Sequence, residues 1–278
     1  RLTFFWSVSS DFFEEIARLR AMRRLWAKIM KHRFQARNKR SMWMRCHIQT
    51  SGVALVQQEP QNNIIRSCIH SLAAILGGTQ SLHVDSFDEA YSVPTEEAAL
   101  LSLRTQQIIQ EETGVTEVVD PLGGSFYLEA LTADLEERIL NELEEIEQAG
   151  GYVQAVADGS LHRKIVDYFT RQHAAIEKGE IRIVAVNANK SGAEPPPVNV
   201  FRYPEGVEDK QKARLAGLRQ ARDEHRVRSA LENLRQACLK KENILPLSLE
   251  CARSRCTEGE LFTVFKETFG LWTPPAMW

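Results

Sequence analysis

Hydrophobic and polar side chains alternate strictly in three short stretches of the first part of the chain. The clearest is 41–49, where the apolar set is Met42, Met44, Cys46 and Ile48 and the other set is Ser41, Trp43, Arg45, His47 and Gln49. The same alternation runs from Arg1 to Val8 and from Thr79 to Asp85. Because successive side chains of a strand point to opposite faces, each stretch predicts a strand with one apolar and one largely polar face.

Apolar residues at helical spacing follow each predicted strand. They indicate helices over 11–32, 62–76 and 94–113. Asp11 with Glu14 resembles a capping box, and Gly77 follows the second helix at the position where glycine ends helices. A strand followed by a helix, repeated along the chain, is typical of an α/β protein.

The polar faces of these strands allow two architectures. In an ordinary (β/α)8 barrel the inward side chains are bulky and fill the lumen, whereas here they are Arg, Thr, Ser, His and Gln. Since buried polar groups without partners are costly, such a lumen implies water or a ligand inside it. An antiparallel sheet with its polar face in water would show the same alternation. The intervening helices favour parallel pairing, so we expect the C-terminal strands and helices of a TIM-type barrel.

Beyond about residue 120 the pattern becomes mostly helical. Later helices are predicted over 133–147, 161–176, 210–241 and 257–270. Residues 181–186 predict one short strand, and 193–198, with three consecutive prolines, predict an extended linker. We therefore expect two parts, an α/β part over 1–120 and a mostly helical part over 121–278.

Composition narrows the class of protein. Hydrophobic content of 43% and charged content of 26% are those of a soluble globular protein. The formal net charge of -2 gives no electrostatic reason to expect nucleic acid or an anionic membrane as a partner. No apolar run approaches the roughly 20 residues of a membrane span. These features favour a cytoplasmic protein, or a mitochondrial matrix protein in a eukaryote.

The cysteines and the start of the sequence support two further predictions. The five cysteines form no CxxC pair and have no histidine spacing suited to zinc, so we expect reduced thiols and no metal site. The chain begins without Met and inside a strand pattern. We interpret it as the C-terminal part of something longer.

Candidate binding residues lie at the ends of the predicted strands. Ligand chemistry in a barrel belongs at the carboxyl ends, which here carry His47, Gln49, Gly52, His83, Asp85 and Glu89. Arg1, Arg40 and Arg45 lie at or near the amino ends. A ligand that contacts both groups must run along the barrel axis, with an anionic end near the arginines.

Several motifs, in order along the whole chain, resemble one family. They are RLTFFW at 1–6, RRLW at 23–26, HIQTSG at 47–52, GGTQSLH at 77–83, SFDEA at 86–90 and DPLGGS at 120–125. The chain resembles the large-subunit barrel of the adenosylcobalamin-dependent acyl-CoA mutases, the methylmalonyl-CoA mutase family. The resemblance implies that 1–120 are the C-terminal part of that barrel and that 121–278 are a helical linker or wrapping region. Val53 departs from a Trp that often follows the glycine in that family, and Asp85 departs from an Asn.

The resemblance implies a radical isomerase whose CoA thioester threads the barrel while cobalamin covers the carboxyl mouth. It assigns CoA contacts to Arg1, Thr3, Arg40, Arg45 and Ser81. It assigns contacts with cobalamin or its adenosyl group to His47, Gln49, Gly52, Asp85, Glu89 and Ala90. The family's substrate-reading and proton-handling residues lie upstream of Arg1, so no catalytic residue is assigned.

The resemblance also implies partners. The cobalamin-binding domain is missing, as in isobutyryl-CoA and 2-hydroxyisobutyryl-CoA mutases, where a separate small subunit supplies it. We expect a homo- or hetero-oligomer that is inactive as this chain alone, with an acyl-CoA substrate whose identity the sequence does not specify. Two alternatives stay open: a non-catalytic scaffold derived from the barrel, and a barrel enzyme for another CoA or phosphate ligand without cobalamin.

Overall fold

The computed structural model describes residues 2–192 and 199–273. Arg1, the proline-rich linker predicted at 193–198 and the end of the chain from 274 lie outside the described residues. Within them the chain divides into two compact units, and the boundary along the sequence lies between Phe201 and Arg202. The expected division into 1–120 and 121–278 separates a barrel from its wrapping region, and it stays a prediction.

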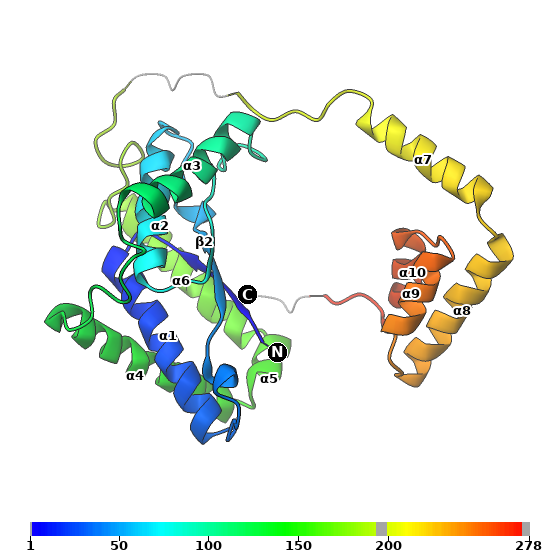
Figure 1. Cartoon of the computed structure of the whole chain (residues 1–278), viewed down its shortest axis with the longest axis horizontal. Coiled ribbons are helices and arrows are strands. Elements are labelled where there is room, and N and C mark those ends of the chain that lie inside the picture. Colours follow the sequence, from blue (N-terminus) through cyan, green and yellow to red (C-terminus); the bar gives the residue numbers. More distant parts are fainter. Residues whose placement is uncertain (1, 193–198, 274–278) are drawn as a thin grey trace. The chain divides into compact units, whose positions relative to one another are not determined.

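The first unit contains a small parallel sheet with helices packed beside it (Figure 1). Its strands are β1 (Phe4–Val8), β2 (Cys46–Thr50) and β3 (Ser81–His83), in the order β1-β2-β3. Both pairings are parallel, with Phe5 opposite His47 and His47 opposite Ser81. The α/β class and parallel pairing are therefore confirmed, and the antiparallel alternative is excluded for these strands.

The two faces of the sheet differ as the alternation predicted. Val8 and Ile48 are fully buried and belong to one core with Ile16 and Leu19 of α1 (Phe12–His32) and Ala73 of α2 (Asn62–Leu76). Full burial of each such aliphatic side chain contributes about 1.5–3 kcal/mol. On the opposite face Phe5 is 62% exposed, and Ser81 is exposed as well. The helices thus close one face of the sheet and leave the other open.

The second strand is shorter than its alternation predicted. Residues Lys39–Met42 form a 3-10 turn, η1, and the strand begins only at Cys46. The cause is local, because the Asn38 side chain accepts a hydrogen bond from the Arg40 backbone N–H at 2.9 Å and closes the turn. Arg40 therefore sits in a turn ahead of β2.

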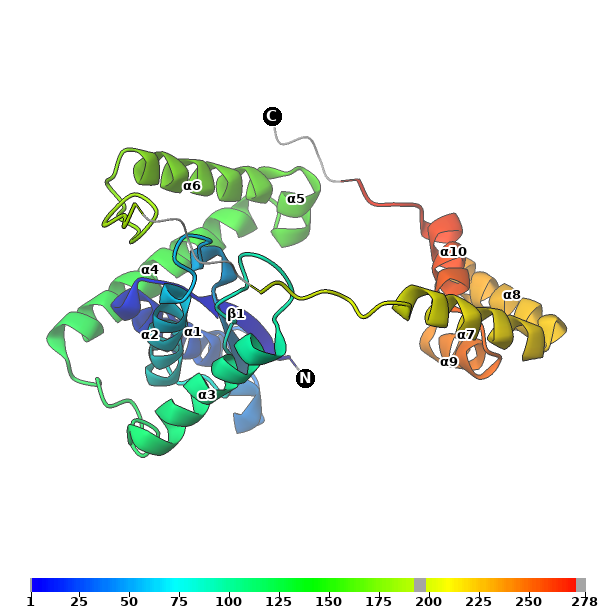
Figure 2. The same cartoon turned by 90° about the horizontal axis from the view of Figure 1, so that it is seen from above.

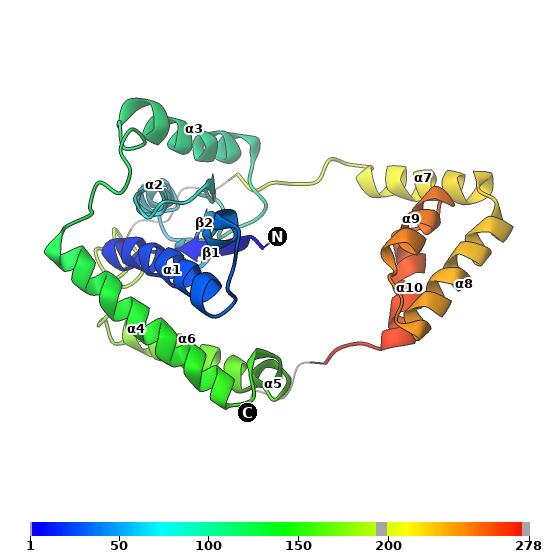
Figure 3. The same cartoon turned by 60° about the horizontal axis from the view of Figure 1, so that its bottom comes forward.

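The loops at the carboxyl ends of the strands lead into η2 (Gly52–Ala54) and α3 (Glu96–Glu112). α4 (Phe126–Gln148) packs against α1 (Figure 3). It begins before the predicted residue 133, because Ser125 caps it by accepting a hydrogen bond from the Leu128 N–H.

Two further helices complete the first unit, α5 (Tyr152–Ala157) and α6 (Ser160–Glu177). Lys164 of α6 ion-pairs with Glu142 and Glu145 of α4 at 2.9 and 2.8 Å. The strand predicted over 181–186 is wrong, since that segment makes only an isolated bridge between Val184 and Ala188.

The second unit contains α7 (Val207–Ala221), α8 (Glu224–Lys240), α9 (Leu245–Arg253) and α10 (Glu258–Phe269) (Figure 2). The last three share a small core that includes Leu234, Cys251 and Val264. The single helix predicted over 210–241 is wrong. Its two parts separate because Asp223 caps α8 with its side chain.

Candidate functional site

A row of side chains crosses the open face of the sheet near its middle. The Phe5 and His47 rings lie 4.8 Å apart between centroids. On the other side of His47, its Nδ1 lies 2.7 Å from Ser81 Oγ. The register of the parallel strands places these three residues side by side. The row combines an aromatic ring, an imidazole and a hydroxyl on a surface that the rest of the described unit leaves open.

The next row is at the carboxyl ends of the strands, where Gln49 lies beside His83. Both contact Asp85: Gln49 Nε2 donates to Asp85 Oδ1 at 2.7 Å, and His83 Nε2 lies 3.5 Å from the same oxygen. The Asp85 backbone is fixed by its N–H, which donates to Thr50 Oγ1 at 2.8 Å. Strand register and loop hydrogen bonds therefore hold this carboxyl in place.

Asp85 is buried, with 2% exposure, and its second oxygen, Oδ2, has no hydrogen-bond partner. Burial raises the pKa of Asp85 above its ordinary value, although hydrogen bonding to Gln49 and the charge of His83 oppose the rise. Loss of hydration and the charge of Asp85 likewise raise the pKa of Glu89. The edge thus carries two carboxyls that hold their protons more tightly than free carboxyls do.

Gly52, which has no side chain, lies beside the same two carboxyls. A Cβ placed on Gly52 would lie 3.5 Å from Asp85 Oδ2 and 3.4 Å from Glu89 Cγ. The position where a side chain would stand on Gly52 is therefore bordered by both carboxyls at ordinary contact distance. Ala90 lies on the same loop, where its carbonyl accepts a hydrogen bond from Gln57 Nε2 at 3.1 Å. Five of the six residues predicted for the cofactor, all but His47, are gathered here: Gln49, Gly52, Asp85, Glu89 and Ala90.

The residues predicted for CoA line two pockets at the amino side of the sheet. Thr3, Arg45 and Ser81 line one of about 340 Å³, together with Phe5 and His47. Arg40 and Arg45 line the other, of about 440 Å³. Arg45 lies in both pockets, and Arg1 is outside the described residues. Two guanidinium groups close together provide bidentate donors for phosphate.

Aromatic residues at this side were not among the predicted site residues. Trp43, 59% exposed, lines the larger pocket beside Arg40 and Arg45, and Phe5 lines the smaller one. The alternation had placed both rings on the polar faces. A large aromatic ring on an otherwise polar face was the signal that could have identified them.

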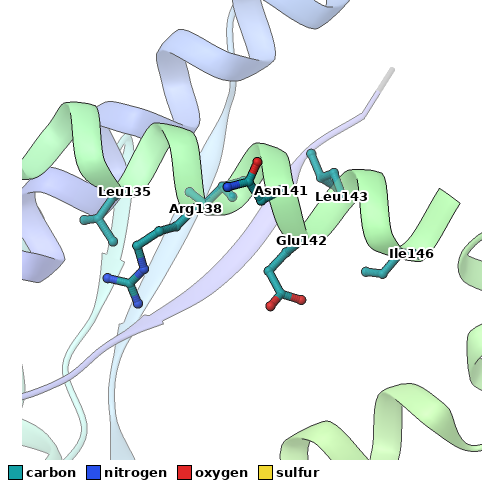
Figure 4. A pocket seen from close by; sticks show the side chains of 7 residues that line it. Leu135, Arg138, Asn141, Glu142, Leu143 and Ile146 are labelled. Carbon is teal, nitrogen blue, oxygen red and sulfur yellow. The ribbon is translucent and has the colours of Figure 1, made fainter. Parts of the chain in front are cut away.

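A further groove lies outside this site. It has a volume of about 410 Å³ and runs along α4, lined by Leu135, Arg138, Ile139, Asn141, Glu142, Leu143 and Ile146 (Figure 4). No predicted site residue lines it. In the described parts of the chain no cluster of metal-ligating side chains is present, and no helix has the length and apolarity needed to cross a membrane.

Known proteins resemble this chain along almost its entire length. The Methylmalonyl-CoA mutase family profile matches residues 1–271. A methylmalonyl-CoA mutase of Cereibacter sphaeroides is 43% identical over 97% of this chain and 38% of its own length. The probable mitochondrial methylmalonyl-CoA mutase of Caenorhabditis elegans is 42% identical over 97% of this chain and 36% of its own length.

A relative named as a subunit is similar to the same degree. The 2-hydroxyisobutanoyl-CoA mutase large subunit of Aquincola tertiaricarbonis is 40% identical over 98% of this chain and 48% of its own length. The chain thus spans between a third and a half of the length of these relatives. Since the family profile covers nearly every residue, this chain belongs to the methylmalonyl-CoA mutase family.

Proposed function

We propose that the chain forms part of the ligand-binding barrel of an adenosylcobalamin-dependent acyl-CoA mutase. The observation that carries the proposal is the open face of the parallel sheet. At its amino side Arg40 and Arg45 line adjoining pockets, and at its carboxyl side Asp85 and Glu89 flank Gly52. One elongated ligand and one cofactor can therefore approach the same face from opposite ends.

On this proposal the amino side binds the CoA portion of the thioester. Arg40 and Arg45 pair with phosphate, as guanidinium groups do with bidentate geometry, while Thr3 and Ser81 donate hydroxyl hydrogen bonds. Arg1 belongs to the same set by its place in the motif. His47, joined to Ser81 and packed on Phe5, stands between the two ends of the face.

The carboxyl side fits a cofactor with polar substituents. Asp85 Oδ2 is buried without a partner, and Gly52, which has no side chain, borders both carboxyls. Gln49, Glu89 and Ala90 would complete the contacts, with His47 beneath them. Adenosylcobalamin, when bound, supplies the radical chemistry that rearranges a carbon skeleton. The residues of this chain orient the ligands and exclude water from the lumen.

The remaining parts of the assembly follow from the same proposal. Residues 1–120 contribute three of the eight strands that a TIM-type barrel needs, and 121–278 wrap the barrel. Upstream sequence supplies the other strands and the catalytic residues. A separate small subunit binds cobalamin, and the assembly works in the cytoplasm or, in a eukaryote, the mitochondrial matrix.

A reconstitution assay tests the proposal. The isolated 278-residue chain is expected to show no turnover of an acyl-CoA with adenosylcobalamin, because most of the lumen is absent. The protein extended by its upstream sequence and supplied with a cobalamin-binding subunit is expected to isomerise an acyl-CoA only when adenosylcobalamin is added. Turnover without adenosylcobalamin would indicate a different barrel enzyme, and binding of neither ligand would indicate a scaffold.

Variants of the extended protein separate the two ends of the face. Arg45→Ala is expected to raise KM for the thioester about tenfold, the effect of losing roughly 1.4 kcal/mol of binding. Glu89→Gln is expected to weaken cofactor binding instead. Arg37→Ala is the matched control, since Arg37 is an exposed arginine of the same loop that lines neither described pocket. An equal KM change in the Arg37 variant would refute a specific role for Arg45.

A further inference from the structure

The corner between α9 and α10 brings two cysteines together. α9 ends in a Schellman motif, in which the Cys256 N–H donates to the Cys251 carbonyl at 2.9 Å and the Arg255 N–H donates to the Ala252 carbonyl at 3.0 Å. Arg255 adopts the left-handed backbone that the motif requires, with φ of 63°. This motif characteristically places the side chains of its first and sixth residues in contact, and here both are cysteines.

The two cysteines belong to the core of the second unit, where the Cys256 thiol donates to the Val227 carbonyl at 3.9 Å. Cys251 is fully buried, whereas Cys256 is partly exposed. Burial, together with the neighbouring Cys256, raises the pKa of Cys251 to about 12. Burial also raises the pKa of Cys256, although the neighbouring Cys251 thiol opposes that rise. Cys256 is the more exposed of the two sulfurs, so a dissolved oxidant reaches it first.

We propose that Cys251 and Cys256 form a reversible redox-modification site, at which a peroxide converts the two thiols into an intramolecular disulfide. The Cys256 sulfur attacks one peroxide oxygen, the O–O bond breaks, and the departing oxygen takes the thiol proton to leave as water. Cys256 is then a sulfenic acid.

The second step uses Cys251. Its sulfur attacks the Cys256 sulfur, the S–O bond breaks, and the hydroxide takes the Cys251 proton to leave as a second water. The two thiols lose two electrons and two protons in all, and hydrogen peroxide is reduced to two waters. A dithiol reductant reverses the change by thiol–disulfide exchange.

The disulfide would lock the α9–α10 corner covalently. The segment from Cys251 to Cys256 is only six residues long, so the disulfide would constrain the local geometry of the corner. That corner packs against α8 through Leu234 and Cys238. The site is independent of the proposed barrel chemistry, because it lies entirely within the second unit.

Peptide mapping of the full chain tests the proposal. The reduced protein is treated with one equivalent of hydrogen peroxide, remaining thiols are blocked with N-ethylmaleimide under denaturing conditions, and trypsin is added without reductant. Trypsin cleaves between the two cysteines, after Arg253 and Arg255. The expected product is peptide 242–253 joined to peptide 256–266, and dithiothreitol should separate them. Two results would overturn the proposal. One is a disulfide to Cys238, and the other is recovery of Cys251 and Cys256 as N-ethylmaleimide adducts after the peroxide has been consumed.

Three variants test whether the α9–α10 corner is what brings Cys251 and Cys256 together. Cys251→Ser is expected to leave a sulfenic acid on Cys256 that dimedone traps. Arg255→Gly should retain the disulfide, because glycine readily adopts the left-handed backbone. Disulfide formation should be about tenfold slower in Arg255→Val than in Arg255→Gly, since the left-handed conformation costs a residue with a Cβ on the order of 1–2 kcal/mol. Equal rates in the glycine and valine variants would contradict the role of the corner.

Discussion

Buried charged groups have ion-pair partners at the α1–α4 contact but few at the carboxyl edge of the sheet. At the contact, Arg20 of α1 is 9% exposed and pairs with Asp120 at 3.2 Å and Glu129 at 2.6 Å, while also donating to Thr132 Oγ1 at 3.0 Å. At the edge, the basic side chain beside Asp85 is His83, whose Nε2 lies 3.5 Å from Asp85 Oδ1. Among the described ion pairs, no lysine or arginine joins Asp85 or Glu89.

The two places differ in how completely the chain itself supplies hydrogen-bond partners to a buried charged group. Arg20 has its hydrogen-bond partners within the chain, so its charge holds α4 against α1. Asp85 keeps one buried oxygen without a partner, which is costly in a folded protein unless something else supplies the hydrogen bond. At this edge the chain itself therefore leaves one carboxyl oxygen without a hydrogen bond.

The largest expected effect is at the paired site. Arg20→Met should lower the free energy of unfolding by about 2–3 kcal/mol, because Thr132 and two carboxylates lose a charged donor. Urea denaturation monitored by circular dichroism measures the change. Arg24→Met is the matched control on the same helix, since Arg24 is more exposed and Lys28 still pairs with Glu136. It should cost less than about 1 kcal/mol, and equal losses would remove the distinction.

A buried group that stays neutral gives the second effect. Burial, and to a smaller degree the charge of Arg66, lower the pKa of His70 to about 4 from 6.5. The folded state therefore favours neutral His70. The contribution of His70 to the free energy of unfolding is present above pH 6.5 and is lost as pH falls from 6.5 towards 4. Between pH 7 and pH 5 the loss should be about 1–2 kcal/mol.

Denaturation of His70→Gln across this pH range isolates that contribution. The variant should lose less stability on acidification than the parent, because glutamine cannot take up the proton. His32→Gln, on an exposed position of α1, is the control and should follow the parent curve. A parallel shift of the His70 variant at every pH would mean that the histidine acts through packing alone.

The smallest effect has the opposite sign and lies at the unpaired site. Asp85→Asn should raise stability at pH 7 by about 1 kcal/mol, because it removes a buried charge while keeping an oxygen to accept from Gln49. The folded-state pKa of Asp85 is raised, so its charge destabilises above the unfolded-state pKa and stability returns as pH falls. The gain should therefore shrink on acidification. A loss of stability at pH 7 would show that the carboxylate is needed structurally.

The sequence predicted the parts of this structure that depend on local spacing. Alternation placed Ile48 inside and His47 on the open face, and strand–helix repetition favoured the parallel sheet that the structure contains. The prediction was wrong at 41–45, where the Asn38 side chain closes a turn that alternation cannot reveal. The unpartnered oxygen of Asp85 was equally hidden, because it depends on how Gln49 and Gly52, distant in sequence, surround it.

The parallel sheet also has two open edges. In the described residues β1 and β3 each pair only with β2, so the outer backbone groups of both strands have no strand beside them. β1 is rich in aromatic residues, and an exposed apolar strand edge readily recruits another strand. A polypeptide of this length made alone would therefore be prone to self-association. Its solubility would therefore depend on whether another strand covers those two edges.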